Sequence, residues 1–191
     1  MVDYRDTCAV RLPGSVCRSG RKLNNSEALI AEGRVWLFAE DNINTDLMMP
    51  QSVFAKSLEE QMRNVFATYR PGWVDQVRPG DILVGGRNFG TGSSRPGSLL
   101  LKRLGIAALV AESINGLFYR NCINYALPAM ECPGIRDFLS EGETARVDVA
   151  EGFVESLARR TKLPGAKMPE FLQAIVRAGG IMDRLRSEGY L

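Results

Sequence analysis

The part of the chain that most restricts its fold is residues 81–113, which read "DILVGGRNFGTGSSRPGSLLLKRLGIAALVAES". A short apolar run, a loop with two glycines, an amphipathic segment that ends at Gly105 and a second apolar run follow one another directly. The apolar runs are too continuous for strands with a solvated face, and strand, helix and strand at this spacing favour parallel pairing through right-handed crossovers. We therefore predict an α/β fold with a partly parallel sheet and flanking helices.

Elements on either side complete this prediction. They are a strand over 33–40, a shaped loop over 41–50, a helix over 57–69 with Ser57 and Glu60 as a capping box, a helix over 114–127 that buries Ile114, Leu117 and Phe118, a hairpin around Glu151 and Gly152, and a terminal helix from Pro169 that is interrupted at Gly179 and Gly180. The hairpin adds antiparallel strands, so the sheet should be mixed. Residues 1–30 lack clear periodicity, so we expect a flexible N-terminal extension there. We expect residues 31–191 to form a single domain.

Charge and residue usage narrow the class of function. The formal net charge is only +2, from 24 Lys and Arg against 22 Asp and Glu, which gives little general attraction to nucleic acid. No apolar run approaches the roughly 18 residues of a membrane span, and the first residues do not resemble a signal peptide. We therefore expect a cytoplasmic protein without nucleic-acid or membrane partners.

Cysteine and histidine usage bears on metals and on catalysis. The four cysteines are irregularly spaced, without a Cys-x-x-Cys pair, so we expect no metal or cofactor held by this chain. Cys122 lies in an apolar helical pattern and should be a buried small hydrophobe. Histidine is absent, which removes the usual proton-transfer residue near neutral pH. Acid–base catalysis would therefore need other groups or a second chain.

The loop "NFGTGSSR", residues 88–95, is the candidate chemical centre. A glycine turn between a strand and a helix exposes backbone N–H groups, which favours an anion, and Arg95 adds a planar fork suited to a carboxylate. The loop lacks the Lys-Ser or Lys-Thr of a P-loop and the third glycine of the dinucleotide fingerprint. The alternative is purely structural, with the glycines shaping a turn and Ser93 or Ser94 capping the helix.

Three segments in this order, "DNINTDLMMP", "GDILVGGRNFGTGSSR" and "GIAALVAESINGLFYRNCINYALP", resemble the small subunits of isopropylmalate dehydratase and its relatives in the aconitase superfamily, such as homoaconitate and dimethylmalate dehydratases. The resemblance implies a swivelling β/β/α domain that closes over a large subunit carrying a four-iron, four-sulfur cluster. It also implies a hydro-lyase that reversibly dehydrates or isomerises a hydroxy di- or tricarboxylic acid, as in leucine biosynthesis. The partners would be the large subunit and the small-molecule acid.

The resemblance also assigns roles within the loop. Ser93 would remove a proton from carbon and Arg95 would bind a substrate carboxylate, with Ser94, Gly92 and Thr91 beside them. A serine hydroxyl is a poor base, and a helix N-terminus contributes only about 0.3 to 2 kcal/mol, so the partner and a water-excluded site must supply the remaining activation. An isolated small subunit should therefore be inactive.

The family selects its substrates with a short loop that falls here, by offset from Pro50, on Val53 to Lys56. Lys56 could therefore meet a substrate carboxylate, and the alternative is a solvated charge. Neighbouring polar residues are expected to have structural roles, and for Asn42, Thr45 and Asp46 the alternative is contact with the substrate. Those that should shape the turn or join loop and helix are Asn42, Thr45, Asp46, Asn88 and Asn121.

The chain departs from its relatives at three places. Pro96 and Gly97 stand where most relatives have Glu-His, Thr91 replaces a frequent Cys, and Asn44 replaces a usual Asp. These differences leave Ser93 and Arg95 in place, so the reaction class is better predicted than the substrate. They also leave open a second class of function, a non-catalytic carboxylate-binding or regulatory module that keeps the swivel fold.

Overall fold

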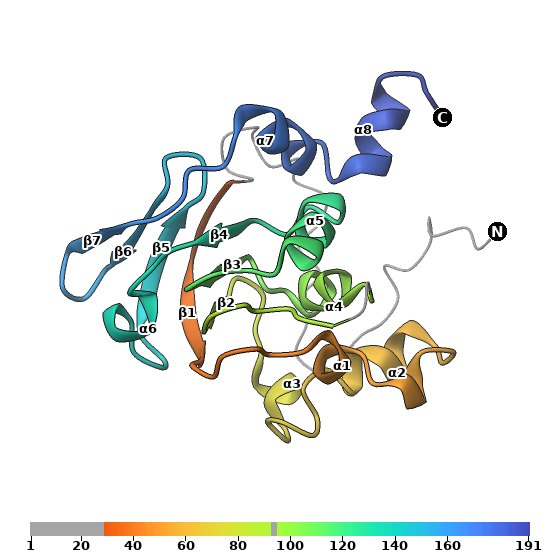
Figure 1. The fold of residues 1–191 in the computed structure, drawn as a ribbon, viewed down its shortest axis with the longest axis horizontal. Helices are drawn as coiled ribbons and strands as arrows, with labels where there is room; N and C mark the ends of the chain where they lie inside the picture. Colours follow the sequence, from red (N-terminus) through yellow and green to blue (C-terminus); the bar gives the residue numbers. More distant parts are fainter. Residues whose placement is uncertain (1–28, 93–94) are drawn as a thin grey trace.

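The strands form a mixed sheet in the order β4-β3-β2-β1-β5-β6-β7 (Figure 1). The structure, a computed structural model, describes residues 29–92 and 95–191. Strands β1 to β4 are parallel to one another, whereas β5, β6 and β7 join through antiparallel pairs, which confirms the predicted mixed sheet and hairpin. The strands are β1 (Ile30–Phe38), β2 (Ile82–Gly85), β3 (Ala108–Ala111), β4 (Ala129–Glu131), β5 (Thr144–Asp148), β6 (Phe153–Ser156) and β7 (Thr161–Pro164).

Strand β1 joins the two halves of the sheet by changing partner along its length. Residues Ile30–Arg34 pair with antiparallel β5, and Val35–Phe38 pair with parallel β2. This explains why the strand begins upstream of the predicted 33–40, because its first residues belong to a ladder whose other strand lies more than a hundred residues away. Sequence alternation alone could not reveal that partner.

Most helices lie in the connections between the parallel strands or after them. They are α1 (Thr45–Met48), the 3-10 turn η2 (Gln51–Val53), α2 (Leu58–Arg63), α3 (Trp73–Gln76), α4 (Gly97–Leu104), α5 (Gly116–Asn124), α6 (Ile135–Phe138), α7 (Glu170–Arg177) and α8 (Ile181–Ser187). The predicted capping box of Ser57 and Glu60 begins α2, and Gly105, at φ +101°, ends α4. None of the helices in the described ranges is long and apolar enough to cross a membrane.

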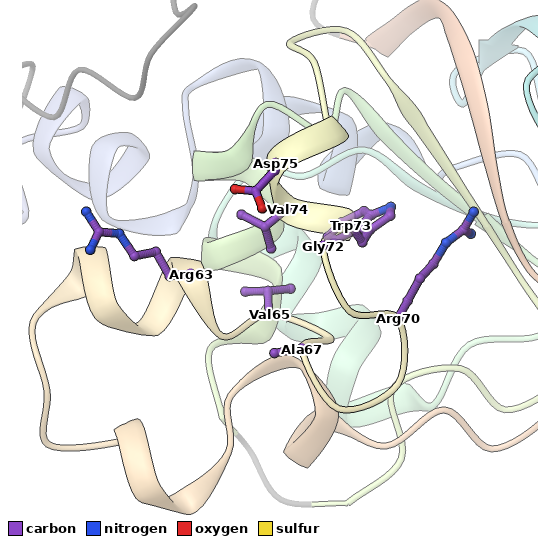
Figure 2. Close-up of a pocket in the computed structure, with 8 residues that line it drawn as sticks. All are labelled: Arg63, Val65, Ala67, Arg70, Gly72, Trp73, Val74 and Asp75. Carbon is purple, nitrogen blue, oxygen red and sulfur yellow. The ribbon is translucent and has the colours of Figure 1, made fainter.

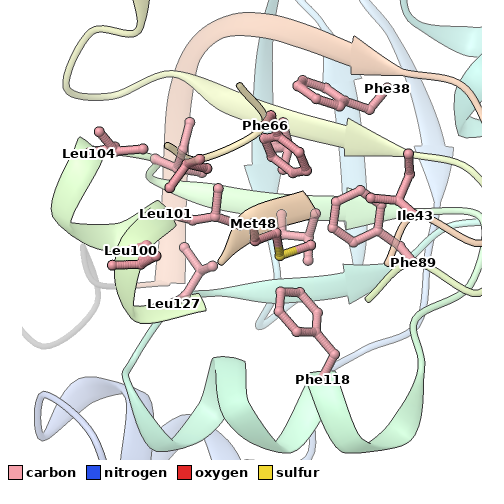
Figure 3. Close-up of a cluster of buried hydrophobic side chains, with 14 of the residues drawn as sticks. Phe38, Ile43, Met48, Phe66, Phe89, Leu100, Leu101, Leu104, Phe118 and Leu127 are labelled. Atoms are coloured by element: carbon pink, nitrogen blue, oxygen red, sulfur yellow. The ribbon is translucent and has the colours of Figure 1, made fainter. Parts of the chain in front are cut away.

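Two apolar clusters lie on opposite faces of the parallel strands. Leu83 of β2 belongs to the first cluster, which Leu101 of α4 and Phe118 of α5 help to form (Figure 3). The next residue, Val84, belongs to the second, which it shares with Val147 of β5. Side chains alternate along a strand, so α4 helps to cover one face, while the antiparallel strands contribute to the core on the other face together with Ile135 of α6 and Val176 of α7. Both apolar strands, β2 and β3, are buried, as predicted.

Some local predictions were wrong in detail. The shaped loop 41–50 contains the one-turn helix α1, because the Asn44 side chain accepts the backbone N–H of Asp46 and caps it. Helix α2 ends at Arg63, well before residue 69, and Phe66 adopts a positive φ of 56°. Leu117 was expected in the core but is 39% exposed, because it lies on the outer face of α5.

Candidate functional site

The loops after β1, β2 and β3 meet at the carboxyl edge of the parallel strands, where α/β sheets commonly bind ligands. Asn88 lies at their centre: its side-chain amide donates to Asn42 Oδ1 at 2.8 Å and accepts from Asn115 Nδ2 at 3.4 Å. Its backbone N–H donates to Ser113 Oγ at 2.8 Å. The expected structural role of Asn88 is confirmed, since it joins three loops that are distant in sequence.

The glycine loop packs tightly between the turn at α1 and helix α5. Gly90 has φ +82°, and a Cβ placed there would lie 2.2 Å from the Phe118 ring. Gly92 has φ +100°, and its Cβ would lie 2.4 Å from Asn44 Oδ1. Both conformations and both contacts require glycine. The two glycines therefore fix the path of the loop against its neighbours.

The backbone amides of this loop are less available than the sequence suggested. Gly90 and Thr91 both donate their N–H groups to the carbonyl of Ile43, at 2.8 and 3.1 Å, and the Thr91 carbonyl accepts the N–H of Thr45 at 2.8 Å. The N–H groups of the loop were expected to point outward toward an anion, and these two instead dock the loop on Ile43. They are therefore not available to an anion.

Helix α4 begins immediately beyond the loop. Pro96 is its N-cap, and Gly97 is its first residue. Gly97 is buried, and a Cβ there would lie 2.7 Å from Met48 Sδ. A side chain at this position thus has no room beside Met48. Ser93 and Ser94, the predicted base and its neighbour, lie outside the described residues.

Arg95 is held by a single stretch of chain. Its Nη1 donates to the Met49 carbonyl at 2.6 Å and forms an ion pair with Asp46 Oδ1 at 2.9 Å, while Nη2 donates to Gln51 Oε1 at 2.8 Å. The side chain is 14% exposed. Asn121 of α5 approaches from the other side, donating from Nδ2 to the Arg95 carbonyl at 3.5 Å, as expected for a residue that joins loop and helix.

The predicted site residues are brought together only in part. Thr91 and Gly92 contact residues 42–45, and Arg95 contacts residues 46–51, so one segment supports all three. Lys56, by contrast, is exposed, close in sequence to Phe54, whose side chain is 52% exposed. No contact links Lys56 to the loop within the described ranges.

Sequence reasoning missed the acceptors of Arg95. Asp46 was expected to shape a turn, with contact to the substrate as the alternative, and Gln51 was not singled out. The sequence offered one signal, an arginine expected at the start of a helix. If its guanidinium is buried, it requires hydrogen-bond acceptors from some other segment. Nothing in the sequence indicates which segment supplies them.

A second polar network lies at the same edge of the sheet. Arg136 contacts Asp41 Oδ1 at 2.9 Å, and Glu112 accepts the backbone N–H groups of Gly134 and Arg136 at 2.9 and 3.1 Å. These contacts join α6 and its N-cap, Gly134, to the residues that follow β1 and β3. We therefore interpret the network as support for the loops that hold the glycine turn.

A small hollow lies away from the glycine loop, between α2 and α3 (Figure 2). Its volume is about 60 Å³, far below the roughly 300 to 1,000 Å³ of typical ligand pockets. Two arginines line it, but Arg63 pairs with Glu59, and Arg70 pairs with Glu141. The hollow has neither the size nor the free charge of a substrate site.

The described cysteines do not fit a metal cluster. Cys122 and Cys132 are buried, and burial raises the pKa of both thiols, that of Cys132 to about 11. Thiolate ligands require the opposite shift. Across residues 29–92 and 95–191 we find no group of three or more His, Cys, Asp or Glu that could hold a metal ion. The prediction that Cys122 is a buried small hydrophobe is confirmed.

Comparison with known proteins places this geometry in a family. The model of the aconitase C-terminal domain matches residues 40–133, which include the glycine loop, α4 and α5. The small subunit of the isopropylmalate/citramalate isomerase of Methanocaldococcus jannaschii is 40% identical over 161 residues, covering 83% of this chain and 95% of the relative. A 3-isopropylmalate dehydratase small subunit of Methanopyrus kandleri is 37% identical over 162 residues, with 84% and 95% covered.

A solved structure agrees with these relatives. The crystal structure of a 3-isopropylmalate dehydratase from M. jannaschii superposes with a TM-score of 0.76 at 27% identity, covering 83% of this chain and 95% of that one. The resemblance inferred from the three sequence segments is thus confirmed over nearly the whole length of the relatives. This chain belongs to the family of 3-isopropylmalate dehydratase small subunits, which share the aconitase C-terminal domain.

Proposed function

We propose that this chain is the small subunit of a hydro-lyase that reversibly dehydrates 3-isopropylmalate or a closely similar hydroxy dicarboxylic acid, in the manner of leucine biosynthesis. The observation that carries the proposal is the 40% identity to the isopropylmalate/citramalate isomerase small subunit over 95% of that relative. The activity requires a large subunit, which we infer carries the iron–sulfur cluster, because the described cysteines of this chain do not fit one. We place the complex in the cytoplasm.

The site supports a division of roles within residues 91–95. Arg95 lies at the carboxyl edge of the sheet with a nearly buried guanidinium, which suits a substrate carboxylate. Ser93 would accept the proton from carbon, as the family resemblance implies. Closure of the large subunit over this edge would exclude water, which strengthens each electrostatic contact. A cluster bound to the partner would act as a Lewis acid on the departing hydroxyl.

The substrate proposal rests on what the two kinds of relative have in common. They are named for isopropylmalate and for citramalate, both hydroxy dicarboxylates. Arg95 would serve either acid, because a guanidinium binds the carboxylate and not the alkyl group. Selection between the alkyl groups would fall to the exposed segment around Phe54 and Lys56.

The test is reconstitution of the full chain with the large subunit of the same organism. Formation of the unsaturated acid is followed by absorbance, with 3-isopropylmalate and citramalate compared. We expect the complex to turn over substrate and the isolated chain to be inactive. Ser93→Ala should lower kcat by at least about a hundredfold. Arg95→Lys should raise KM, because lysine keeps the charge but loses the planar fork. The control is Arg186→Lys, because that arginine forms an ion pair on exposed α8.

Two outcomes would contradict the proposal. If Ser93→Ala retained wild-type kcat, the serine would not be the base. If the reconstituted complex turned over neither acid while the isolated chain still bound them, a carboxylate-binding module would be the better description.

A further inference from the structure

The arginine of the glycine loop is oriented by one short segment of chain. Its three acceptors, Asp46 Oδ1, the Met49 carbonyl and Gln51 Oε1, all come from the six residues 46–51. This segment comprises most of α1 and the start of η2. We call it the arginine clamp.

A count of the N–H donors of Arg95 shows which of them remain for a ligand. A guanidinium has five N–H groups. The Met49 carbonyl accepts one hydrogen of Nη1 and Gln51 accepts one of Nη2, while Asp46 Oδ1 forms an ion pair with Nη1. The Nε–H and the second Nη2–H are left, since Arg95 makes no other side-chain contact within the described residues. Two N–H groups are the number that a bidentate carboxylate needs.

The clamp is itself fixed to the glycine loop. The backbone N–H of Asp46 donates to Asn44 Oδ1 at 2.8 Å, and that same oxygen lies against Gly92. Thr91 pairs with Asn44 in a short parallel bridge. Asp46 is thus anchored on its backbone side, while its side chain, 56% exposed, reaches Arg95.

We propose that Asp46 and Gln51 are positioning residues that preorganise Arg95 for the substrate carboxylate. They act through Arg95 and not on the substrate, so the inference rests on the carboxylate-binding role proposed above. Two hydrogen bonds and one ion pair hold the guanidinium plane, so the Nε–H and one Nη2–H would bind the ligand with little loss of rotamer freedom. The Asp46 charge balances Arg95 before the ligand arrives.

A first experiment tests the clamp without the partner. In the isolated, isotopically labelled full chain, NMR of the arginine Nη–H groups reports rotation about the Cζ–N bonds. We expect separate, slowly exchanging Nη signals for Arg95, which merge in Asp46→Ala and in Gln51→Ala. Asp46→Asn should keep them apart, because its Oδ1 can still accept. Signals that are already averaged in the wild-type chain would overturn the inference, whatever the enzyme does.

A second experiment tests its consequence in the reconstituted complex. We expect Asp46→Ala to raise KM about tenfold, a loss of roughly 1.4 kcal/mol in binding, with kcat nearly unchanged, and Asp46→Asn to restore most of it. The control is Asp183→Ala, since Asp183 is equally exposed at 55% and pairs with Arg186 at the same kind of distance, 2.8 Å. That variant should leave KM unchanged.

A double variant separates this inference from the proposed function. If Asp46 acts through Arg95, the double variant Asp46→Ala with Arg95→Lys should have the same KM as Arg95→Lys alone. Additive effects would overturn the inference, and so would a KM lowered by both Asp46→Ala and Asp46→Asn, because Asp46 would then compete with the substrate. An unchanged KM in Arg95→Lys alone would instead refute the carboxylate role of Arg95.

Discussion

At the scale of single residues, Gly97 is the clearest case in which packing decides the side chain. It is the first residue of α4, and a Cβ there would lie 2.7 Å from Met48 Sδ and 3.1 Å from Met48 Cβ. Met48 is fully buried, so it has little freedom to retreat. The glycine at this position is therefore matched by the residue that faces it.

We predict that Gly97→Ala destabilises the protein by about 1 to 3 kcal/mol, the usual range for overpacking a core. The matched control is Gly116→Ala, because Gly116 is likewise the first residue of a helix, α5, and a Cβ there meets nothing within 4 Å. Denaturant unfolding of both variants measures the difference. Equal midpoints would show that Met48 moves aside freely.

At the scale of elements, the turn that leads into β5 is held by one carboxylate. Glu143 accepts the hydroxyl of Ser156 and the backbone N–H of Ser140, the latter at 3.0 Å, and it pairs with Arg159 at 3.3 Å. Burial alone would raise the pKa of Glu143, but the Ser156 and Ser140 hydrogen bonds and Arg159 together lower it. The turn, β5 and β6 are thus joined through an ionised group.

This lowered pKa predicts how stability depends on pH. A carboxyl group that is more acidic when folded stabilises the protein above its unfolded pKa of about 4.3, and the contribution is lost as the pH falls through the folded value. Glu143→Gln should therefore lower stability by about 1 to 3 kcal/mol at pH 7 and much less near pH 3. Thermal unfolding at both pH values measures this.

The control for this pH series is Glu155→Gln in the same hairpin, where the ion pair with Lys162 is longer, at 3.8 Å. Its effect should be small at both pH values. A deficit for Glu143→Gln that is as large at pH 3 as at pH 7 would mean that charge is not the cause.

Elements with local signals were predictable, and those defined by distant partners were not. Continuous apolar runs indicate strands β2 and β3, and the capping residues Ser57 and Gly105 indicate helix ends. Strand β4 has three residues and β7 has four that are mostly exposed, so neither carries a readable period. The position of the glycine loop was predicted for the same local reason, whereas the contacts of Arg95 depend on tertiary structure.

At the scale of the whole molecule, β1 is the strand whose backbone pairs with both halves of the described sheet. Gly33 lies in its first half, opposite Ala145 of β5, and a Cβ there would lie 2.0 Å from the Gly80 carbonyl that precedes β2. One residue thus contacts both halves. The parallel and antiparallel strands should therefore unfold together.

We predict that Gly33→Ala lowers stability by about 3 kcal/mol or more, since a backbone carbonyl cannot yield as a side chain can. Fluorescence of Trp36 and Trp73, which lie in the helix-covered cluster, and hydrogen exchange in β6 should report the same loss. A loss seen by fluorescence alone would show that β5 to β7 unfold independently of the rest.

The arginine clamp has a consequence for protein engineering. The segment around Phe54 and Lys56 begins directly after Gln51, so a loop exchanged between relatives to alter the preferred alkyl group would also carry away an acceptor of Arg95 if its boundary fell too early. Chimaeras should instead exchange residues 43–56 and 88–97 as a matched pair, because these two stretches are built against each other. Recombinants in which the two stretches come from different relatives should be mostly inactive.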